Sequence, residues 1–298
     1  MIVVDALTKT YRGNIRALRG IDLEIDNGMF GLVGPNGAGK TTLMRILTGL
    51  LRPTSGRVEV FGYNVSRSRD RQAIKAMLGY LPQELGLYPD LSAREFLDYV
   101  AILKGLTDHR ARRRQIDELL DLAGLSDQAD QRLKTYSGGM KRRVGVAQAL
   151  LGDPRILIVD EPTAGLDPEE RVRLRNLLAE TSRRCTVILS THIVEDVSQS
   201  CTDLAVLSEG RVLYRGEPRS LIAQARDKVW HIVTSGEKPN AGLVVVSTRQ
   251  MDTGVEYRVL GNPSGQYHPI PVEPSLEDGY IWLMHQERNP ASEMSGGE

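Results

Sequence analysis

A glycine-rich segment from Gly34 to Thr42 has the residue types and the spacing needed to hold phosphate groups, in the pattern GxxxxGK[ST]. Its glycines allow successive backbone N–H groups to point at a β-phosphate, and the dipole of a following helix adds positive charge there. Lys40 can reach the β- and γ-phosphates, and the Thr41 hydroxyl is a ligand for Mg²⁺. The sequence therefore predicts an MgATP site formed by Gly34, Pro35, Asn36, Gly37, Ala38, Gly39, Lys40, Thr41 and Thr42.

Two adjacent carboxylates, Asp160 and Glu161, end a short apolar run that begins at Ile156. Beside the phosphate-binding segment, Asp160 would hold Mg²⁺ through water, and Glu161 could orient and deprotonate the water that attacks ATP. The alternative is an acidic strand end that only caps the following Pro162 and Thr163. The predicted Mg²⁺ site near both segments favours the catalytic interpretation.

The elements around these residues predict a parallel sheet. A strand over 29–33 leads into the phosphate-binding segment, and a helix over 41–51 leaves it. Apolar runs at 156–159, 186–190 and 204–207 are typical of buried strands, and the pattern over 169–184 is helical. Wholly apolar strands that alternate with helices indicate an α/β fold whose sheet is covered on both faces.

The N-terminal part alternates apolar and polar residues, which predicts strands over 2–4, 21–25 and 29–33. Gly20 and the pair Asn27–Gly28 separate these strands. Because Asn-Gly is the commonest signal for a two-residue hairpin, we expect the second and third strands to form one.

Further along the chain, the pattern from 93 to 148 is helical, and three short strands follow near 229–234, 242–247 and 255–260 before a last helix over 275–285. We therefore expect a first domain over 1–222 with a helical insert at about 85–150. A small α+β accessory domain is expected over 226–285. The polar segment 286–298 is expected to be a disordered tail.

The composition fits a protein of the cytosol. The 298 residues contain 38 Lys and Arg against 38 Asp and Glu, and this balance gives no reason to expect a nucleic-acid partner. No apolar run approaches the ~20 residues of a membrane helix. Cys185 and Cys201 lack metal-ligand spacing, so we expect reduced thiols and no metal site built from protein ligands alone.

Residues 1 to about 220 resemble the ATP-binding subunit of an ABC transporter, because six motifs of that family occur in the family's order. They are Walker A at Gly34–Thr42, the Q-loop at Gln83, the signature at Ser137–Met140, Walker B at Ile156–Glu161, the D-loop at Ala164–Asp167 and the switch histidine at His192. The resemblance implies a P-loop NTPase fold of the ABC ATPase type, with a mixed sheet, an N-terminal antiparallel part, an inserted helical subdomain and the small C-terminal domain.

The resemblance also implies roles for residues that would otherwise be unremarkable. Gln83 would reach Mg²⁺ or the attacking water, and His192 would bond the γ-phosphate, although a histidine there could equally be a satisfied core residue. Tyr11 takes the position of the aromatic that stacks on adenine; the alternative is a half-buried aromatic. The signature residues Ser137, Gly138 and Gly139 would contact the ATP bound by a second copy, so that ATP is sandwiched in a homodimer.

One residue departs from the family pattern: Met140 stands where the signature usually has Gln. A thioether cannot donate a hydrogen bond, but Ser137 and the glycine backbone remain, so we expect activity to survive. The segment Met140–Arg143 resembles the drug-, antibiotic- and lipid-exporting branch of the family.

The resemblance therefore implies an ATPase that energises an exporter from the inner face of the cell membrane. Its partners would be a separately encoded integral membrane subunit, facing the segment Leu87–Leu97, and a second copy of itself. The alternative is a soluble ABC-type nucleotide switch acting on the ribosome or DNA. That class usually carries two cassettes, a long coiled coil or a basic arm, and this sequence shows none of them.

Overall fold

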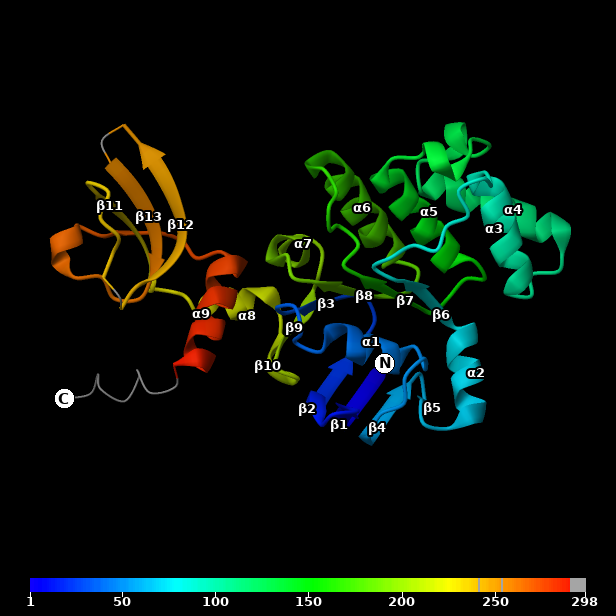
Figure 1. Cartoon of the computed structure of the whole chain (residues 1–298), viewed down its shortest axis with the longest axis horizontal. Helices are drawn as coiled ribbons and strands as arrows, with labels where there is room; N and C mark the ends of the chain where they lie inside the picture. The colour runs from blue at the N-terminus through cyan, green and yellow to red at the C-terminus, as the bar shows by residue number, and fades with distance from the viewer. Residues whose placement is uncertain (241, 253, 290–298) are drawn as a thin grey trace. The chain divides into compact units, whose positions relative to one another are not determined.

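The computed structural model describes residues 1–240, 242–252 and 254–289. The chain forms two compact units that meet between Arg215 and Gly216, and each is described by itself (Figure 1). The sequence prediction placed this boundary a few residues later, between 222 and 226.

The first unit is built on a six-stranded sheet whose strand order is β10-β9-β3-β8-β7-β6. Strand β3 pairs in parallel with β8 and β9, and β7 pairs in parallel with β8 and β6. All residues of β3 and β7 are buried, as a sheet covered on both faces requires. The strands are β3 (Met29–Val33), β6 (Leu78–Leu81), β7 (Ile156–Asp160), β8 (Thr186–Thr191), β9 (Asp203–Ser208) and β10 (Arg211–Gly216). The predicted parallel α/β core is confirmed.

Helices cover this sheet on both sides. Figure 1 shows α6 (Pro168–Thr181) and α7 (Val194–Ser198) on one side and α1 (Lys40–Leu47) on the other. Helix α6 begins with Asp167 as its N-cap and Pro168 at its first position, the arrangement that favours helix initiation. Each of these helices begins shortly after a residue at the carboxyl edge of the sheet: α1 begins at Lys40, α6 follows the Asp160–Glu161 pair, and α7 begins two residues after His192.

A second, antiparallel sheet has the order β2-β1-β4-β5. Its members are β1 (Ile2–Tyr11), β2 (Ile15–Ile25), β4 (Ser55–Val60) and β5 (Tyr63–Asn64), and α2 (Ser68–Ala76) follows. The predicted hairpin at Asn27–Gly28 is wrong, because β2 lies in this sheet and β3 in the parallel one. The hairpin is formed instead by β1 and β2, whose pairing reaches Tyr11 and Ile15 around Gly13 and Asn14. Strand β3 has only buried residues and takes partners on both of its edges, so it cannot serve as the second arm.

Three helices are inserted between β6 and β7. They are α3 (Ala93–Leu103), α4 (His109–Leu122) and α5 (Gly138–Leu150), with short 3₁₀ turns at Ser126–Gln128 and Leu133–Thr135. Each α-helix has a side-chain N-cap: Ser92 in a capping box with Glu95, Asp108, and Ser137. This insert corresponds to the helical subdomain expected from the resemblance.

The second unit is a four-stranded antiparallel sheet with helices. The sheet order is β12-β13-β11-β14, and the elements are α8 (Pro218–Ala223), β11 (Val229–Thr234), β12 (Val244–Met251), β13 (Gly254–Leu260), β14 (Ile270–Pro271) and α9 (Leu276–Arg288), with a 3₁₀ turn at Gly265–Tyr267. Val229 and Leu260 form a small core against Ile281 and Trp282 of α9. Helix α9 runs past the predicted tail start at 286, and the rest of that tail prediction, 290–298, lies outside the described residues. Among the residues described, no helix has both the length and the apolar character to cross a membrane.

Candidate functional site

The phosphate-binding segment connects β3 to α1, as predicted. Gly37 and Gly39 have φ values of 82° and 106°, in the left-handed region that favours glycine. Gly34 has a different reason to be glycine, because a Cβ atom there would lie 2.2 Å from the carbonyl oxygen of Leu207. The loop therefore folds closely between β9 and the start of α1, with its backbone facing a pocket.

Lys40 is buried at the floor of this pocket, with 5% of its surface exposed. Its Nζ donates to the carbonyl oxygens of Gly34 at 2.6 Å and Pro35 at 3.2 Å. The same Nζ lies 3.5 Å from Oε1 of Glu161. A buried ammonium held by loop carbonyls is a fixed positive charge in a setting where electrostatic attraction is strong.

Asp160 lies at the carboxyl end of β7, where its Oδ2 accepts a hydrogen bond from the Thr41 hydroxyl at 3.2 Å. Burial raises the pKa of Asp160 above its ordinary value, and the side chains of Ser190 and Thr41 oppose that shift. Its other oxygen, Oδ1, is buried and has no hydrogen-bond partner among the described residues. A free carboxylate oxygen beside a hydroxyl is the donor set that Mg²⁺ accepts together with phosphate oxygens and water, so these residues fit the ion.

Glu161 follows directly and contacts two of the predicted site residues. Its Oε2 lies 2.7 Å from Nδ1 of His192, and its Oε1 faces Lys40. Glu161 is 6% exposed, whereas the His192 side chain is 47% exposed. The carboxylate is thus held between a buried cation and an imidazole that reaches solvent.

Lys40, Thr41, Glu161 and His192 share one pocket of about 220 Å³, whereas Gly34 and Asp160 are not among its lining residues. Gln83, which follows β6, also lines it. The lining residues are Ala17, Pro35, Asn36, Gly37, Ala38, Gly39, Lys40, Thr41, Thr42, Gln83, Glu161 and His192. The structure thus brings residues from five distant segments of the sequence to one pocket. Ala17 was not predicted, since an alanine inside β2 carries no sequence signal for a binding site.

Tyr11 is not part of this lining but lies beside it. Its hydroxyl is 3.3 Å from Oγ1 of Thr42, and its ring is 38% exposed. Nζ of Lys9 lies 5.4 Å from the centre of the ring, within the range of a cation–π contact. An exposed aromatic face therefore stands next to the last residue of the phosphate-binding segment.

The residues Ser137, Gly138 and Gly139 are also absent from the lining of this pocket. They form the beginning of α5, where Oγ of Ser137 accepts from the backbone N–H of Met140 at 3.1 Å. Ser137 and Gly138 are exposed, whereas Gly139 is buried and a Cβ there would lie 2.2 Å from the Glu170 carboxylate. The N-terminus of α5 is therefore exposed at a place outside the phosphate pocket of its own chain.

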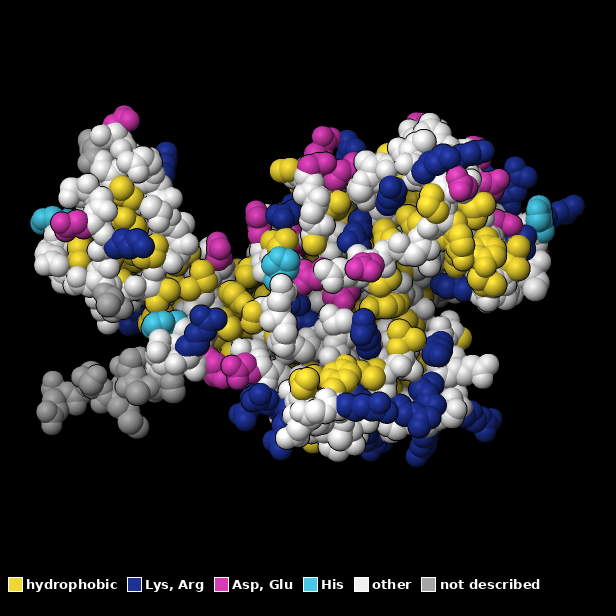
Figure 2. Space-filling view, in the orientation of Figure 1, with side chains coloured by type: hydrophobic (Ala, Val, Ile, Leu, Met, Phe, Trp, Pro, Cys, Tyr) yellow, Lys and Arg dark blue, Asp and Glu magenta, His cyan; other side chains and the backbone are white. Residues whose placement is uncertain are grey.

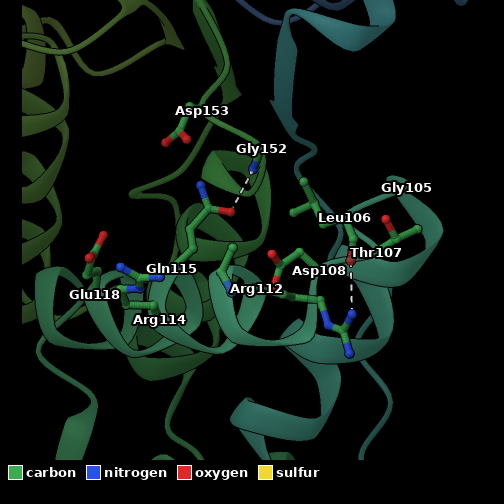
Figure 3. Close-up of a pocket in the computed structure, with 11 residues that line it drawn as sticks. Gly105, Leu106, Thr107, Asp108, Arg112, Arg114, Gln115, Glu118, Gly152 and Asp153 are labelled. Carbon is green, nitrogen blue, oxygen red and sulfur yellow. Dashed lines mark hydrogen bonds between the residues drawn. The ribbon is translucent and has the colours of Figure 1, made fainter.

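A larger cavity of about 550 Å³ lies in the helical subdomain, between the α3–α4 turn, α4 and the turn after α5 (Figure 3). Some of its polar side chains are engaged within the protein. Arg112 donates to Asp98 and to the carbonyl oxygen of Leu106, and Gln115 accepts from the N–H of Gly152. This cavity brings together none of the predicted site residues, so its size does not make it the candidate site.

Comparisons with known proteins agree with this geometry. The family described as "ABC transporter" matches residues 18–164. The uncharacterized ABC transporter ATP-binding protein YxlF of Bacillus subtilis (strain 168) is 36% identical over 231 residues, covering 77% of this chain and 75% of YxlF. The daunorubicin resistance ATP-binding protein DrrA3 of Streptomyces coeruleorubidus is 36% identical over 268 residues, covering 88% of this chain and 83% of DrrA3.

Among solved structures, the dimeric post-hydrolysis state of the ATP-binding cassette MJ0796, bound to ADP and Pi, is similar with a TM-score of 0.66 and 28% identity, covering 73% of this chain and 98% of that chain. The family match includes the phosphate-binding segment, Gln83, the start of α5 and the Asp160–Glu161 pair. The fold, the pocket and these likenesses lead to one conclusion: the chain belongs to the ATP-binding proteins of ABC transporters and is an ATPase.

Proposed function

We propose that this chain energises an ABC exporter by hydrolysing MgATP in a site that a second copy of the chain completes. The observation that carries the catalytic part is the position of Glu161, whose carboxylate lies at the phosphate pocket between Lys40 and His192. A base in this position is within reach of a water molecule next to a γ-phosphate.

In the proposed site, Lys40 and the backbone N–H groups of Gly34–Thr42 hold the β- and γ-phosphates. Thr41 and Asp160 hold Mg²⁺, with Gln83 as a further ligand; when bound, the ion neutralises charge that develops on the phosphate oxygens. The exposed ring of Tyr11 would stack on the adenine, because it stands beside Thr42 at the end of the loop.

Glu161 and His192 carry the proposed hydrolytic step together with Gln83. Gln83 positions the attacking water, and Glu161 accepts its proton as the oxygen bonds to the γ-phosphorus and the bond to the β,γ-bridging oxygen breaks. His192 orients the Glu161 carboxylate through the contact at 2.7 Å and bonds the γ-phosphate. Because Gln83, Glu161 and His192 already lie in one pocket, less reorganisation is needed to reach the transition state.

The proposal that two copies share each ATP is supported by the start of α5. Ser137 and Gly138 are exposed and lie outside the pocket of their own chain. A helix N-terminus with glycine amides is suited to bind an oxyanion, so we assign these residues, with Gly139, to the γ-phosphate held by the other copy. The likeness to a dimeric cassette bound to ADP and Pi supports the same arrangement.

A separate membrane subunit is supported by an apolar surface on the helical subdomain. Four large apolar side chains there are exposed: Tyr88 (51%), Tyr99 (43%), Ile102 (52%) and Leu103 (68%). Figure 2 shows apolar side chains gathered over α3, where three of these residues lie. We propose that this surface, next to the predicted segment 87–97, contacts the membrane subunit and places the chain on the inner face of the membrane.

The exporter assignment rests on the relative DrrA3, whose name records drug resistance, and on the Met140–Arg143 segment. We further propose that 1–222, with its insert at 85–150, is the nucleotide-binding domain and that 226–285 is accessory. No comparison favours a ribosome- or DNA-acting switch.

The catalytic proposal is tested by phosphate release from the purified full-length chain. We expect Mg²⁺-dependent turnover that EDTA abolishes, and a fall in kcat of about 100-fold or more in Glu161→Gln, because general-base catalysis contributes at least that much. Glu180→Gln, an exposed glutamate on α6, is the matched control and should keep wild-type turnover. Near wild-type turnover in Glu161→Gln would show that the base is another residue.

A further inference from the structure

Two segments of the site are joined twice, once in the pocket and once behind it. In the pocket, Glu161 contacts His192 at 2.7 Å. Behind it, the hydroxyl of Thr163 donates to Oδ2 of Asp196 at 2.6 Å. The turn that follows Glu161 is therefore tied to the segment that follows His192 by two parallel contacts.

The second contact is fully enclosed. Asp196 is 0% exposed and Thr163 is 1% exposed. The other oxygen of Asp196 lies 3.9 Å from Nε of Arg171 and 3.8 Å from Nη1 of Arg175, both on α6. These arginines offset the charge, yet that oxygen has no hydrogen bond within the described residues. A buried ion pair is weak evidence for stability, so a role of Asp196 in holding the site together is worth testing separately from stability.

Helix α7, which carries Asp196, is fixed from its other side as well. Its Val197 packs against Gly31 of β3, where a Cβ atom would lie only 2.6 Å from Cγ1 of Val197. Strand β3 leads into the phosphate-binding segment, so α7 packs directly on an element of the site. Through Asp196, this fixed helix holds the turn at Thr163.

The backbone conformation of Glu161 gives a reason for a contact that fixes the turn after it. Its φ is +48°, a left-handed conformation that costs free energy in a residue with a side chain. Its backbone N–H donates to the carbonyl oxygen of Ser190 at 2.9 Å, which fixes only the start of the turn. The end of the turn is fixed by Thr163.

We propose that Asp196 is a positioning residue for ATP hydrolysis: by accepting the Thr163 hydroxyl, it keeps the carboxylate of Glu161 directed at His192 and Lys40. The inference rests on the proposed role of Glu161 as the base. Asp196 itself does not line the pocket, so its removal should lower the rate of the chemical step and leave nucleotide binding in place.

The test measures kcat, the Kd for ATP and the melting temperature of the chain in four single variants, in a double variant and in Glu161→Gln. Thr163→Val removes the hydroxyl and keeps the shape, Thr163→Ser keeps the hydroxyl, and Asp196→Ala removes the acceptor. Asp278→Asn is the matched control, because Asp278 is also 0% exposed and paired with an arginine, but in the second unit.

We expect kcat to fall about tenfold or more in Thr163→Val and in Asp196→Ala, since small displacements of a catalytic group are costly. The Kd for ATP should stay within about twofold, Thr163→Ser should recover most of the rate, and the double variant Thr163→Val/Asp196→Ala should be no slower than the worse single one. Asp278→Asn should melt earlier with kcat unchanged.

The proposal is overturned if Thr163→Val and Asp196→Ala melt earlier but keep kcat within about twofold of wild type. It is also overturned if Thr163→Ser is as slow as Thr163→Val, since the hydroxyl would then be irrelevant. Glu161→Gln, assayed in the same series, separates the claim that Glu161 is the base from the claim that Asp196 positions it. Turnover retained in Glu161→Gln refutes the base assignment, whereas turnover lost there but kept in Thr163→Val refutes only the positioning role.

Discussion

At the scale of single residues, the site is organised around buried charges that face one another across a small pocket. Lys40, Glu161 and His192 form a continuous line of contacts at 3.5 Å and 2.7 Å. Asp160 is turned toward Thr41 instead, so the two adjacent carboxylates have different partners. This division fits one carboxylate for a metal ion and one for water, which is how paired acids acquire distinct roles.

The first prediction concerns Lys40. Lys40→Ala removes the buried ammonium at the floor of the pocket, so the affinity for ATP should fall by at least about 100-fold, as the loss of a desolvated charge–phosphate interaction implies. Titration with a fluorescent ATP analogue measures this. Lys75→Ala, on the last turn of α2, is the control and should bind normally. Unchanged affinity in Lys40→Ala would refute the assignment of the loop.

At the scale of elements, the features that the sequence predicts best are those marked by a local pattern of residues, such as buried strands. The strands around Met29–Val33 and Ile156–Asp160 are marked by unbroken apolar runs, and the structure confirms their parallel sheet. The Asn27–Gly28 hairpin was wrong because a turn signal says nothing about which sheet the next strand joins. The sheet that β3 joins depends on its pairing with β8 and β9 on its two edges, which is a non-local effect.

The parts that could not be predicted depend on contacts between distant segments. Helix α7 has only five residues and no side-chain N-cap, so neither its period nor its boundary was visible in the sequence. The contact between Thr163 and Asp196 spans 33 residues and depends on the packing of α7 on β3. The candidate site residues could be predicted because motifs mark them, whereas the residues behind them carry no motif.

A prediction at this scale concerns α9 and its attachment to β13. Asp278 closes the capping box at the start of α9 and also accepts two hydrogen bonds from Arg258, at 3.0 Å and 2.6 Å. Burial by itself raises the pKa of Asp278, but the hydrogen bonds from Arg258 and Ser275 outweigh it and hold the pKa below the ordinary value of 3.8. Asp278→Asn should destabilise the second unit by about 3 kcal/mol, because it removes the buried charge that pairs with the half-buried guanidinium of Arg258, whose side chain is 19% exposed.

The pH dependence follows from the sign of that shift. A carboxylate with a lowered pKa stabilises the folded state fully above its unfolded pKa, and this stability is lost as the pH falls through the folded pKa. In thermal melts, the melting temperature should therefore fall less between neutral and acidic pH in Asp278→Asn than in the wild type. Equal pH dependence in both would show that Asp278 does not carry this stability.

At the scale of the whole molecule, we propose that one chain holds two parts of an ATP site in different places. The phosphate pocket contains Lys40 and Glu161, and the exposed start of α5 contains Ser137 and Gly138. In the proposed dimer, the pocket of one copy faces the start of α5 of the other copy. ATP binding then closes the dimer, and hydrolysis reopens it. The membrane subunit would convert this cycle into transport.

The most direct test is the solution mass of Glu161→Gln, since this variant should bind MgATP and hardly hydrolyse it. Light scattering coupled to size-exclusion chromatography should give the monomer mass of 33.0 kDa without nucleotide and twice that mass with saturating MgATP. Adding Ser137→Arg should keep the chain monomeric while it still binds ATP, because Ser137 is outside its own pocket. A Glu161→Gln chain that binds MgATP and stays at the monomer mass would contradict the shared site.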